Sequence, residues 1–168
     1  DLTGLNMVVG SAEATGVLIE GASDVVIADA AYDISGGSAT AVNAHVDWMG
    51  NIPENITVTG MDINIDTAGD ANVLYFGLCD DITITDNNIE TTGGSRINFN
   101  KTSNAKVTDN YIVIKDIATG YYGNYAVMTT EDDTIVENNE PTTPVVEELQ
   151  DEINNLTQTV EDQQQTID

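Results

Sequence analysis

The chain has 168 residues, of which 29 are acidic and four are basic, for a formal net charge of -25. Such a charge excludes a surface that binds nucleic acid or anionic lipid head groups, because both are polyanions that the chain would repel. The hydrophobic content of 40% is enough for one ordinary core, so a folded chain is expected rather than a disordered one.

The acidic charge has two interpretations. Molar salt shortens the Debye length to roughly 3 Å and screens self-repulsion, which favours a high-salt, halophilic setting. The alternative is an acidic extracellular protein from an ordinary environment, with divalent ions between neighbouring carboxylates. No segment has the spaced acids of an EF-hand or of the glycine-aspartate nonapeptide repeat, so the sequence predicts no dedicated metal site and no cofactor. The lone Cys79 predicts a small buried thiol and no intrachain disulfide.

A turn-centred motif recurs along the chain. It is DVVIADAAY from Asp24, NITVTGMDI from Asn55, DITITDNNI from Asp81, NAKVTDNYI from Asn104 and DTIVENNE from Asp133. Successive motifs lie 31, 26, 23 and 29 residues apart. A unit repeated at intervals of about 20 to 50 residues is typical of a stacked-repeat fold.

The first residues fit the same pattern, since LTGLNMV from Leu2 aligns with VTGMDIN from Val58. We therefore expect the chain to begin inside a repeat and to be a piece of a longer protein.

Each unit provides three short strands in which apolar and polar residues alternate. Two strands flank the turn of the motif, and a third precedes the motif, as NVLYFGL from Asn72 does. Such strands stack on the equivalent strands of the next turn, about 4.8 Å away. The sequence therefore predicts an all-β fold, a parallel β-helix of five to six turns over residues 1–140.

The turn of the motif has a characteristic composition. One position holds only residues that tolerate a left-handed backbone. These residues are Asp29, Gly60, Asp86, Asp109 and Asn138. The next position is asparagine in three units, and we predict that Asn87, Asn110 and Asn139 stack as a structural ladder in which each amide bonds the next.

The segments DITITDNNIETTGG and SNAKVTDNYIVI resemble the repeats of right-handed parallel β-helix proteins of the pectin-lyase-like class. The many Asn and Thr residues, and loops such as TGYYGNYAV, are similar to those of archaeal cell-surface adhesin-like proteins. The resemblance covers Asp1 to about Asn139 and implies a right-handed β-helix. It implies no single function, because this architecture hosts lyases, hydrolases, adhesins and viral tailspikes.

Two acidic pairs, Asp80–Asp81 and Asp132–Asp133, superficially resemble the aspartate pair of polygalacturonases. The other motifs of such an enzyme, Asn-Thr-Asp, Gly-His-Gly and Arg-x-Lys, are absent, and His45 is the only histidine. Both pairs also fall just before the strand of the turn motif, where a structural role is expected. The sequence thus predicts no catalytic residues and no enzyme.

The candidate contact residues are aromatic. Tyr121, Tyr122 and Tyr125 cluster in the longest loop between strands, residues 116–125, and suit sugar stacking or a protein contact. Alternatively, these tyrosines cover the edge of the β-helix or a neighbouring subunit. For Trp48, near His45 in NAHVDWMGN, we predict packing in the core or on its flank.

Three sequons for N-glycosylation are present, at Asn55, Asn100 and Asn155. Each alone is weak in a chain so rich in Asn and Thr. Asn155 falls at an outward position of the C-terminal heptads described next, where a glycan would not disturb a coiled coil.

The pattern changes at Pro141, where residues 141–144 (PTTP) predict a linker. Residues 145–168 then predict a coiled-coil helix, whose apolar seam has spacings of three and four. The seam consists of Val146, Leu149, Ile153, Leu156, Val160, Gln163 and Ile167. β-Branched residues at a and leucine at d favour two parallel strands, hence a homo-oligomer on a stalk. The alternative is a single helix folded back on the β-helix.

These features favour a non-catalytic extracellular protein, structural or adhesive, with a β-helical shaft or head on an oligomerising stalk. Its expected partners are copies of itself and surface glycans or proteins, and a membrane only through segments outside this chain. The first alternative is a tail fibre or spike of a virus infecting an archaeal or halophilic host. The second is a polysaccharide-degrading enzyme.

Overall fold

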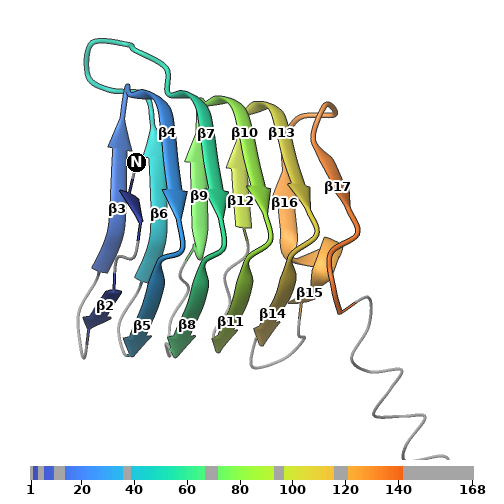
Figure 1. The fold of residues 1–168 in the computed structure, drawn as a ribbon. Helices are drawn as coiled ribbons and strands as arrows, with labels where there is room; N and C mark the ends of the chain where they lie inside the picture. Colours follow the sequence, from blue (N-terminus) through green and yellow to red (C-terminus); the bar gives the residue numbers. More distant parts are fainter. Residues whose placement is uncertain are drawn as a thin grey trace, which may run out of the picture.

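The computed structural model describes residues 2–3, 6–9, 14–35, 39–66, 72–92, 97–115 and 121–141. These residues form an all-β parallel solenoid of about four turns (Figure 1). The predicted parallel β-solenoid is thus confirmed. The number of turns is lower than the five to six predicted, because the first and last strands of sheet A are short: β1 (Leu2–Thr3) has two residues and β17 (Ile135–Glu137) has three.

Each complete turn contributes one strand to each of three sheets, A, B and C, and sheet B has one additional strand at its edge. Sheet A contains β1 (Leu2–Thr3), β4 (Ser23–Ala28), β7 (Glu54–Thr59), β10 (Asp80–Thr85), β13 (Ser103–Thr108) and β17 (Ile135–Glu137). Sheet B contains β2 (Asn6–Val9), β5 (Ala31–Ser35), β8 (Asp62–Asp66), β11 (Asn88–Thr92), β14 (Tyr111–Lys115) and β15 (Tyr121–Tyr122). Sheet C contains β3 (Ala14–Glu20), β6 (Ala39–His45), β9 (Leu74–Gly77), β12 (Ile97–Asn100) and β16 (Val127–Thr129).

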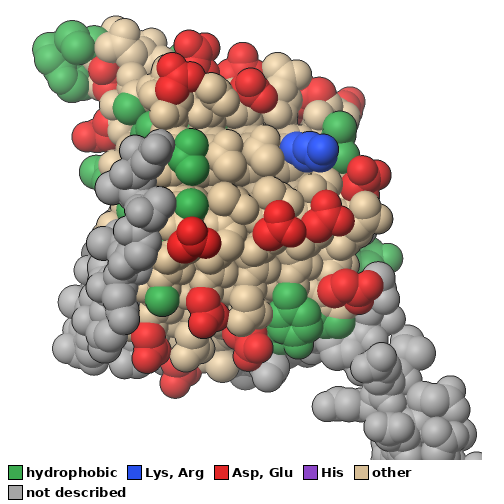
Figure 2. Space-filling view, in the orientation of Figure 1, with side chains coloured by type: hydrophobic (Ala, Val, Ile, Leu, Met, Phe, Trp, Pro, Cys, Tyr) green, Lys and Arg blue, Asp and Glu red, His purple; other side chains and the backbone are tan. Residues whose placement is uncertain are grey.

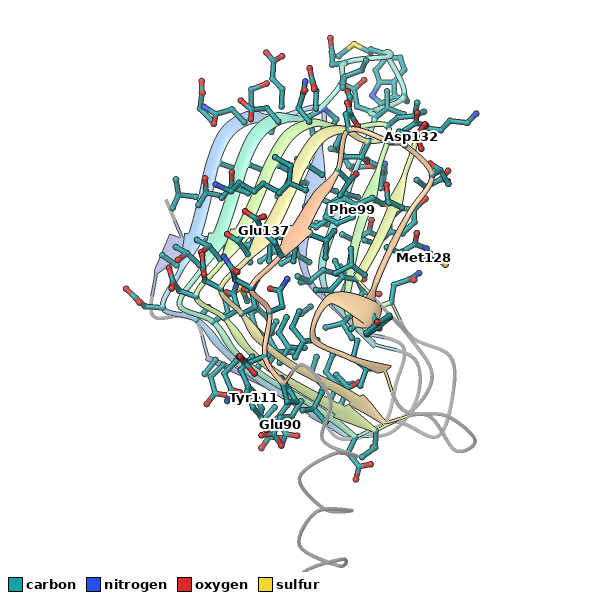
Figure 3. All side chains as sticks on the ribbon, turned by 90° about the vertical axis from the view of Figure 1, so that its right-hand side faces the viewer. Glu90, Phe99, Tyr111, Met128, Asp132 and Glu137 are labelled. Carbon is teal, nitrogen blue, oxygen red and sulfur yellow. The ribbon has the colours of Figure 1, made fainter. Side chains whose placement is uncertain are left out.

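The pairings are parallel, except that β15 runs antiparallel to β14. A short 3-10 helix, η1 (Gly123–Ala126), follows β15. Viewed along the solenoid axis, the three sheets surround a core in which Phe99 lies, while Met128, Glu137 and Tyr111 project outward from sheets C, A and B (Figure 3).

The core consists of equivalent residues stacked from turn to turn. In sheet A, the register places Ile27, Val58, Ile84 and Val107 in one column, and all four are fully buried. In sheet C, the ring of Phe76 stacks on that of Phe99, with centroids 5.3 Å apart. Burying one such side chain contributes about 1.5–3 kcal/mol, so the repeated columns supply most of the stabilisation.

One large polar residue enters this core. Tyr32 of β5 is buried, and the loss of solvent raises its pKa. Its ring is accommodated by Gly16 of β3, where a Cβ atom would lie 2.2 Å from the Tyr32 ring and 2.5 Å from the Ala41 carbonyl oxygen. A side chain at position 16 would therefore displace the ring from the core.

The turn between sheets A and B is stabilised by a buried stack of asparagines. The backbone N–H and the Nδ2 of Asn87 both donate to Asn110 Oδ1, at 3.0 and 2.8 Å. The same two groups of Asn110 donate to Asn139 Oδ1, at 3.1 and 2.8 Å. All three side chains are buried. Each side chain also donates to backbone carbonyls, so the stack satisfies polar groups that would otherwise be buried without a partner.

The residue before each member of this stack has a left-handed backbone, as the turn composition predicts. Positive φ angles between 52° and 62° occur at Asp29, Gly60, Asp86, Asp109 and Asn138. In the two turns that precede Asn87, the position of the asparagine is occupied by the buried apolar residues Ala30 and Met61. The backbone N–H of Met61 still donates to Asn87 Oδ1, at 3.0 Å.

Residues 142–168 lie outside the described part of the chain. The predicted coiled-coil seam, the sequon at Asn155 and most of the PTTP linker fall there, so these remain predictions from the sequence.

Replacing the central asparagine of the stack should destabilise the whole fold. Asn110→Ala removes the donor to the carbonyls of Ile84 and Thr108 and the acceptor of two bonds from Asn87. Each buried polar group left without a partner costs about 1–3 kcal/mol, so we expect a loss of about 3 kcal/mol in urea unfolding. The control Asn88→Ala, an exposed neighbour, should cost less than about 0.5 kcal/mol. Equal losses in the two variants would contradict the role of the stack.

Candidate functional site

The turns from sheet C to sheet A differ strongly in length. Three of them have two residues: Gly21–Ala22, Leu78–Cys79 and Lys101–Thr102. Residues 46–53, between β6 and β7, form a much longer segment, which projects beyond the end of the strands (Figure 1). This insertion accounts for the longest interval between motifs, and a two-residue turn would have been enough to build the solenoid.

The inserted segment, called here the Asp47 hairpin (residues 46–53), is held together by one carboxylate. Asp47 Oδ1 accepts from the backbone N–H groups of Met49 and Asn51, at 2.9 and 2.8 Å, and Asp47 Oδ2 accepts from Asn51 Nδ2 at 2.7 Å. The backbone adds bonds from Asp47 N to Asn51 O and from Gly50 N to Asp47 O, both 3.1 Å. The hairpin therefore has a defined shape without a core of its own.

These bonds also act on the charge of Asp47. The bond from the Asn51 side chain, followed by that from its backbone N–H, lowers the pKa of Asp47 because both favour the carboxylate. A lowered pKa means that the hairpin is stabilised at neutral pH. That stabilisation is lost only when the pH falls through the lowered pKa.

The neighbouring turn leaves room for the hairpin. A Cβ atom at Gly21 would lie 2.8 Å from Asp47 Oδ2 and 3.0 Å from Asn51 Cβ, and Gly21 has φ +60°. Both the left-handed backbone and the close approach require glycine here. The base of the hairpin is thus packed on the preceding turn.

The outer part of the hairpin is apolar and exposed. Trp48 is 91% exposed, Met49 64% and Ile52 52%. A green projection stands at this corner of the molecule in Figure 2, where Figure 1 places the segment. The prediction that Trp48 packs in the core or on its flank is wrong, because the hairpin extends past the ends of the strands, where no described residue covers the indole. His45 is half-buried, with its Nε2 3.8 Å from Glu20 Oε1.

The sequence contains a turn signal for the Asp47 hairpin, but the hydrophobic residues Trp48 and Met49 within it favour an interpretation as core residues. The stretch Asp47-Trp48-Met49-Gly50 has aspartate and glycine at the first and last positions of a type I turn. A turn at the tip of an insertion places its two central side chains in solvent. Trp48 and Met49 are those two residues.

A second feature is an open, polar groove of about 520 Å³ at the start of the sheet A strands. Its lining residues are Asp24, Glu54, Asn55, Asp80, Asp81 and Asn104. Asp80 Oδ1 accepts from Ser103 Oγ at 2.9 Å, Asn104 Nδ2 at 2.8 Å and the backbone N–H of Asp81 at 3.0 Å. These bonds, that from Asn104 first, lower the pKa of Asp80.

Both acidic pairs that the sequence singled out take part in such bonding. Asp133 Oδ2 accepts from the backbone N–H of Asn104, at 3.0 Å, so it and Asp80 connect successive turns. Within the described part of the chain, no group of three or more His, Cys, Asp or Glu side chains is arranged to hold a metal ion. No helix among those residues is long and apolar enough to cross a membrane.

The acids of sheet B alternate with neutral partners. The register pairs Asp33 with Asn64, and Asn64 with Glu90, so that an amide separates the two carboxylates. Asn64 Nδ2 donates to Asp33 Oδ1 at 3.3 Å, and Asn88 Nδ2 donates to Asp62 Oδ1 at 2.9 Å. Alternation matters because equivalent side chains in a parallel stack are only about 4.8 Å apart. The solenoid thereby carries many acids with few direct carboxylate contacts.

Part of the predicted tyrosine loop forms secondary structure. Tyr121 and Tyr122 form β15, and Tyr125 lies in η1 and is 73% exposed. Residues 116–120 and the side chains of Tyr121 and Tyr122 lie outside the described part. Of this cluster, the structure therefore describes one exposed ring.

Two of the sequons lie on the described surface, and both asparagines are exposed. Asn55 Nδ2 donates to Asp24 Oδ1 at 2.6 Å, and Asn100 Nδ2 donates to Tyr75 Oη at 3.3 Å. Thr102, which completes the second sequon, is buried and donates to the Phe76 carbonyl at 2.9 Å. A glycan at Asn100 would therefore have to be attached before this turn folds. The thiol of Cys79 is buried, which raises its pKa to about 12 and leaves it unreactive.

Comparisons with known proteins add no relative: no family model, no curated protein and no solved structure matches this chain.

Removing the carboxylate of the hairpin should release Trp48 without unfolding the solenoid. In Asp47→Ala, the three bonds to Met49 and Asn51 are lost, so the fast component of the time-resolved anisotropy of the indole should grow in amplitude. The urea midpoint should stay close to that of the wild type, because the hairpin lies outside the core. An unchanged anisotropy decay would show that the hydrogen bonds of Asp47 do not hold the hairpin in shape. In the wild type, the same loosening should appear only at pH values below the usual range of an aspartate.

Breaking the alternation of charges should create a salt-dependent defect. Asn64→Asp places three carboxylates in one row of sheet B and removes the bond to Asp33. The urea midpoint should fall at low salt and recover at about 1 M salt, where the Debye length is roughly 3 Å. The control Asn64→Thr loses the same amide without adding charge, and its midpoint should not show this additional salt dependence. If both variants respond equally to salt, repulsion is not the cause.

Proposed function

We propose that this chain is a non-catalytic structural or adhesive module of an extracellular surface protein, and that the Asp47 hairpin is its contact element. The observation that carries the proposal is the exposure of Trp48. It lies on an insertion that the Asp47 carboxylate holds in shape and that the solenoid does not need for folding. Exposing a tryptophan forgoes the stabilisation that its burial would supply. A contact with a partner is the simplest compensation.

The hairpin has the properties of a preformed contact. Its backbone and the Asp47 carboxylate are already bonded internally, so little conformational freedom remains to be lost on binding. Tryptophan combines a large apolar area with few rotatable bonds, which is why it is frequent among residues that dominate binding energy. A flat aromatic face of this kind suits stacking on a neutral sugar ring or insertion into an apolar pocket of a protein.

The rest of the molecule is consistent with a supporting shaft. The stacked columns and the asparagine stack make a continuous array of parallel strands, in which each turn contacts only its neighbours. The acids that resemble catalytic pairs accept bonds between turns. The net charge of -25 favours a salt-rich setting and neutral partners over polyuronates. The predicted stalk would present several such shafts together.

The proposal can be tested with the only tryptophan of the chain. In molar salt, a panel of neutral and acidic oligosaccharides and purified surface proteins is titrated while the emission of Trp48 is recorded. We expect a blue shift with a neutral glycan or a protein, because binding removes the indole from water. Trp48→Ala should weaken that binding by about tenfold or more, measured by calorimetry, and Trp48→Phe should weaken it less. The control Tyr111→Ala, an exposed aromatic on sheet B, should bind as the wild type does.

Two outcomes would contradict the proposal. Release of shortened glycans, lost in Asp80→Asn, would revive the enzyme interpretation. Binding that is insensitive to Trp48→Ala would remove the hairpin as the contact element.

A further inference from the structure

The three faces of the solenoid differ in charge. The described strands of sheet A contain the acids Asp24, Glu54, Asp80, Asp81 and Glu137. Those of sheet B contain Asp33, Asp62, Asp66 and Glu90. Those of sheet C contain Glu20 alone, and neither lysine nor arginine. On a chain of net charge -25, sheet C is therefore the face that another acidic body can approach with the least repulsion.

The outer surface of sheet C carries a row of one residue per strand. The register places these residues side by side in the order Leu18, Asn43, Tyr75, Asn98 and Met128. Leu18 is 54% exposed and Met128 44%, while the three residues between them are half-buried. Figure 3 shows Met128 pointing away from the core on this side of the molecule.

The chemistry of this row reads the same from both ends: apolar, amide, tyrosine, amide, apolar. If a second copy is turned by 180° about an axis along the strands through Tyr75, Leu18 of one copy faces Met128 of the other. Asn43 then faces Asn98, and Tyr75 faces Tyr75. This self-complementarity is what an isologous, two-fold contact requires.

The adjacent row of sheet C is compatible with the same orientation. Glu20 stands at one end of it, in register with His45, Gly77 and Asn100. The two-fold rotation brings Glu20 opposite the end of β16 in the second copy, at the other side of the sheet. The two Glu20 carboxylates therefore lie at opposite ends of the contact and do not face each other.

From these observations we propose that sheet C is the contact face of an antiparallel homodimer of solenoids. Five strands at a spacing of about 4.8 Å make a face roughly 24 Å wide, which is small for a stable interface. The dimer is accordingly weak and strengthens with salt, because the acids of the other faces still repel at long range. A parallel coiled-coil stalk would hold its own solenoids in the same direction, so the two solenoids of this dimer belong to different stalks. This inference goes beyond the proposed function and does not depend on it.

The orientation can be tested by charge exchange in the full chain. Leu18→Glu with Met128→Glu puts like charges opposite each other across the two-fold axis, whereas Leu18→Glu with Met128→Lys puts opposite charges there. By sedimentation velocity in molar salt, we expect the first pair of substitutions to weaken the sheet C association at least tenfold. The second pair should retain or strengthen it. A control with Thr83→Glu and Ile135→Glu adds two carboxylates beside Lys106 on sheet A and should associate as the wild type does.

Three results would overturn the proposal. The first is self-association that none of these substitutions changes. The second is equal weakening by the first pair of substitutions and by the control, and the third is equal weakening by both pairs at positions 18 and 128. The last result would mean a contact through this face in another orientation.

A second variant protects the test against misfolding of the charged variants. Tyr75→Cys places a thiol on the proposed two-fold axis, so a bis-maleimide crosslinker that spans about 10 Å, the usual separation of two packed sheets, should link two copies covalently. Thr83→Cys on sheet A should not link them. The native Cys79 gives little background, because it is buried and its pKa is raised to about 12. Absence of the Tyr75→Cys link in a folded variant would count against the dimer.

Discussion

The parallel register of each strand on the next is the constraint on which the rest of this structure depends. It places each side chain about 4.8 Å from the equivalent side chain of the next turn. A residue type that suits one position therefore recurs as a column of stacked side chains. A residue type that repels its own copy would be unfavourable at every turn of that column. Isoleucine and valine fill the inner columns, and Asn87, Asn110 and Asn139 fill a buried polar column in which each amide is both donor and acceptor. An isolated buried asparagine would be costly, whereas a stacked one is satisfied.

The same register governs how the chain carries its charge. Carboxylates in neighbouring turns would repel at this distance, and sheet B alternates them with amides and hydroxyls that donate to them. In sheet A, Glu54 and Asp80 are directly opposite, and Asp80 is compensated by three donors from the next turn and its own. Sheet C avoids the problem by having almost no charge. The acidic composition is therefore unevenly distributed in space, and the neutral face and the Asp47 hairpin are the two surfaces suited to contacts.

The two surfaces were predictable to different degrees. The turn signal Asp47-x-x-Gly50 and the long interval between motifs indicate an insertion, but a single tryptophan in a sequence favours burial. Only the place of the hairpin, past the last residues of the strands, leaves Trp48 in solvent. The neutral row of sheet C could not be predicted from the sequence, because its members are separated by turns of unequal length. Strand pairing must be known before Leu18, Asn43 and Tyr75 can be seen as neighbours.

The sequence by itself determined the architecture. A repeated motif with alternating apolar residues, left-handed turn residues and stackable asparagines has few ways to satisfy its backbone and bury its apolar side, and a parallel solenoid is one in which every turn repeats the solution. The tertiary structure alone decided which residues meet across turns and which are left outside. The physical reason is that burial and charge contacts depend on register and on the presence of a covering layer, and neither is encoded in the local pattern around one residue.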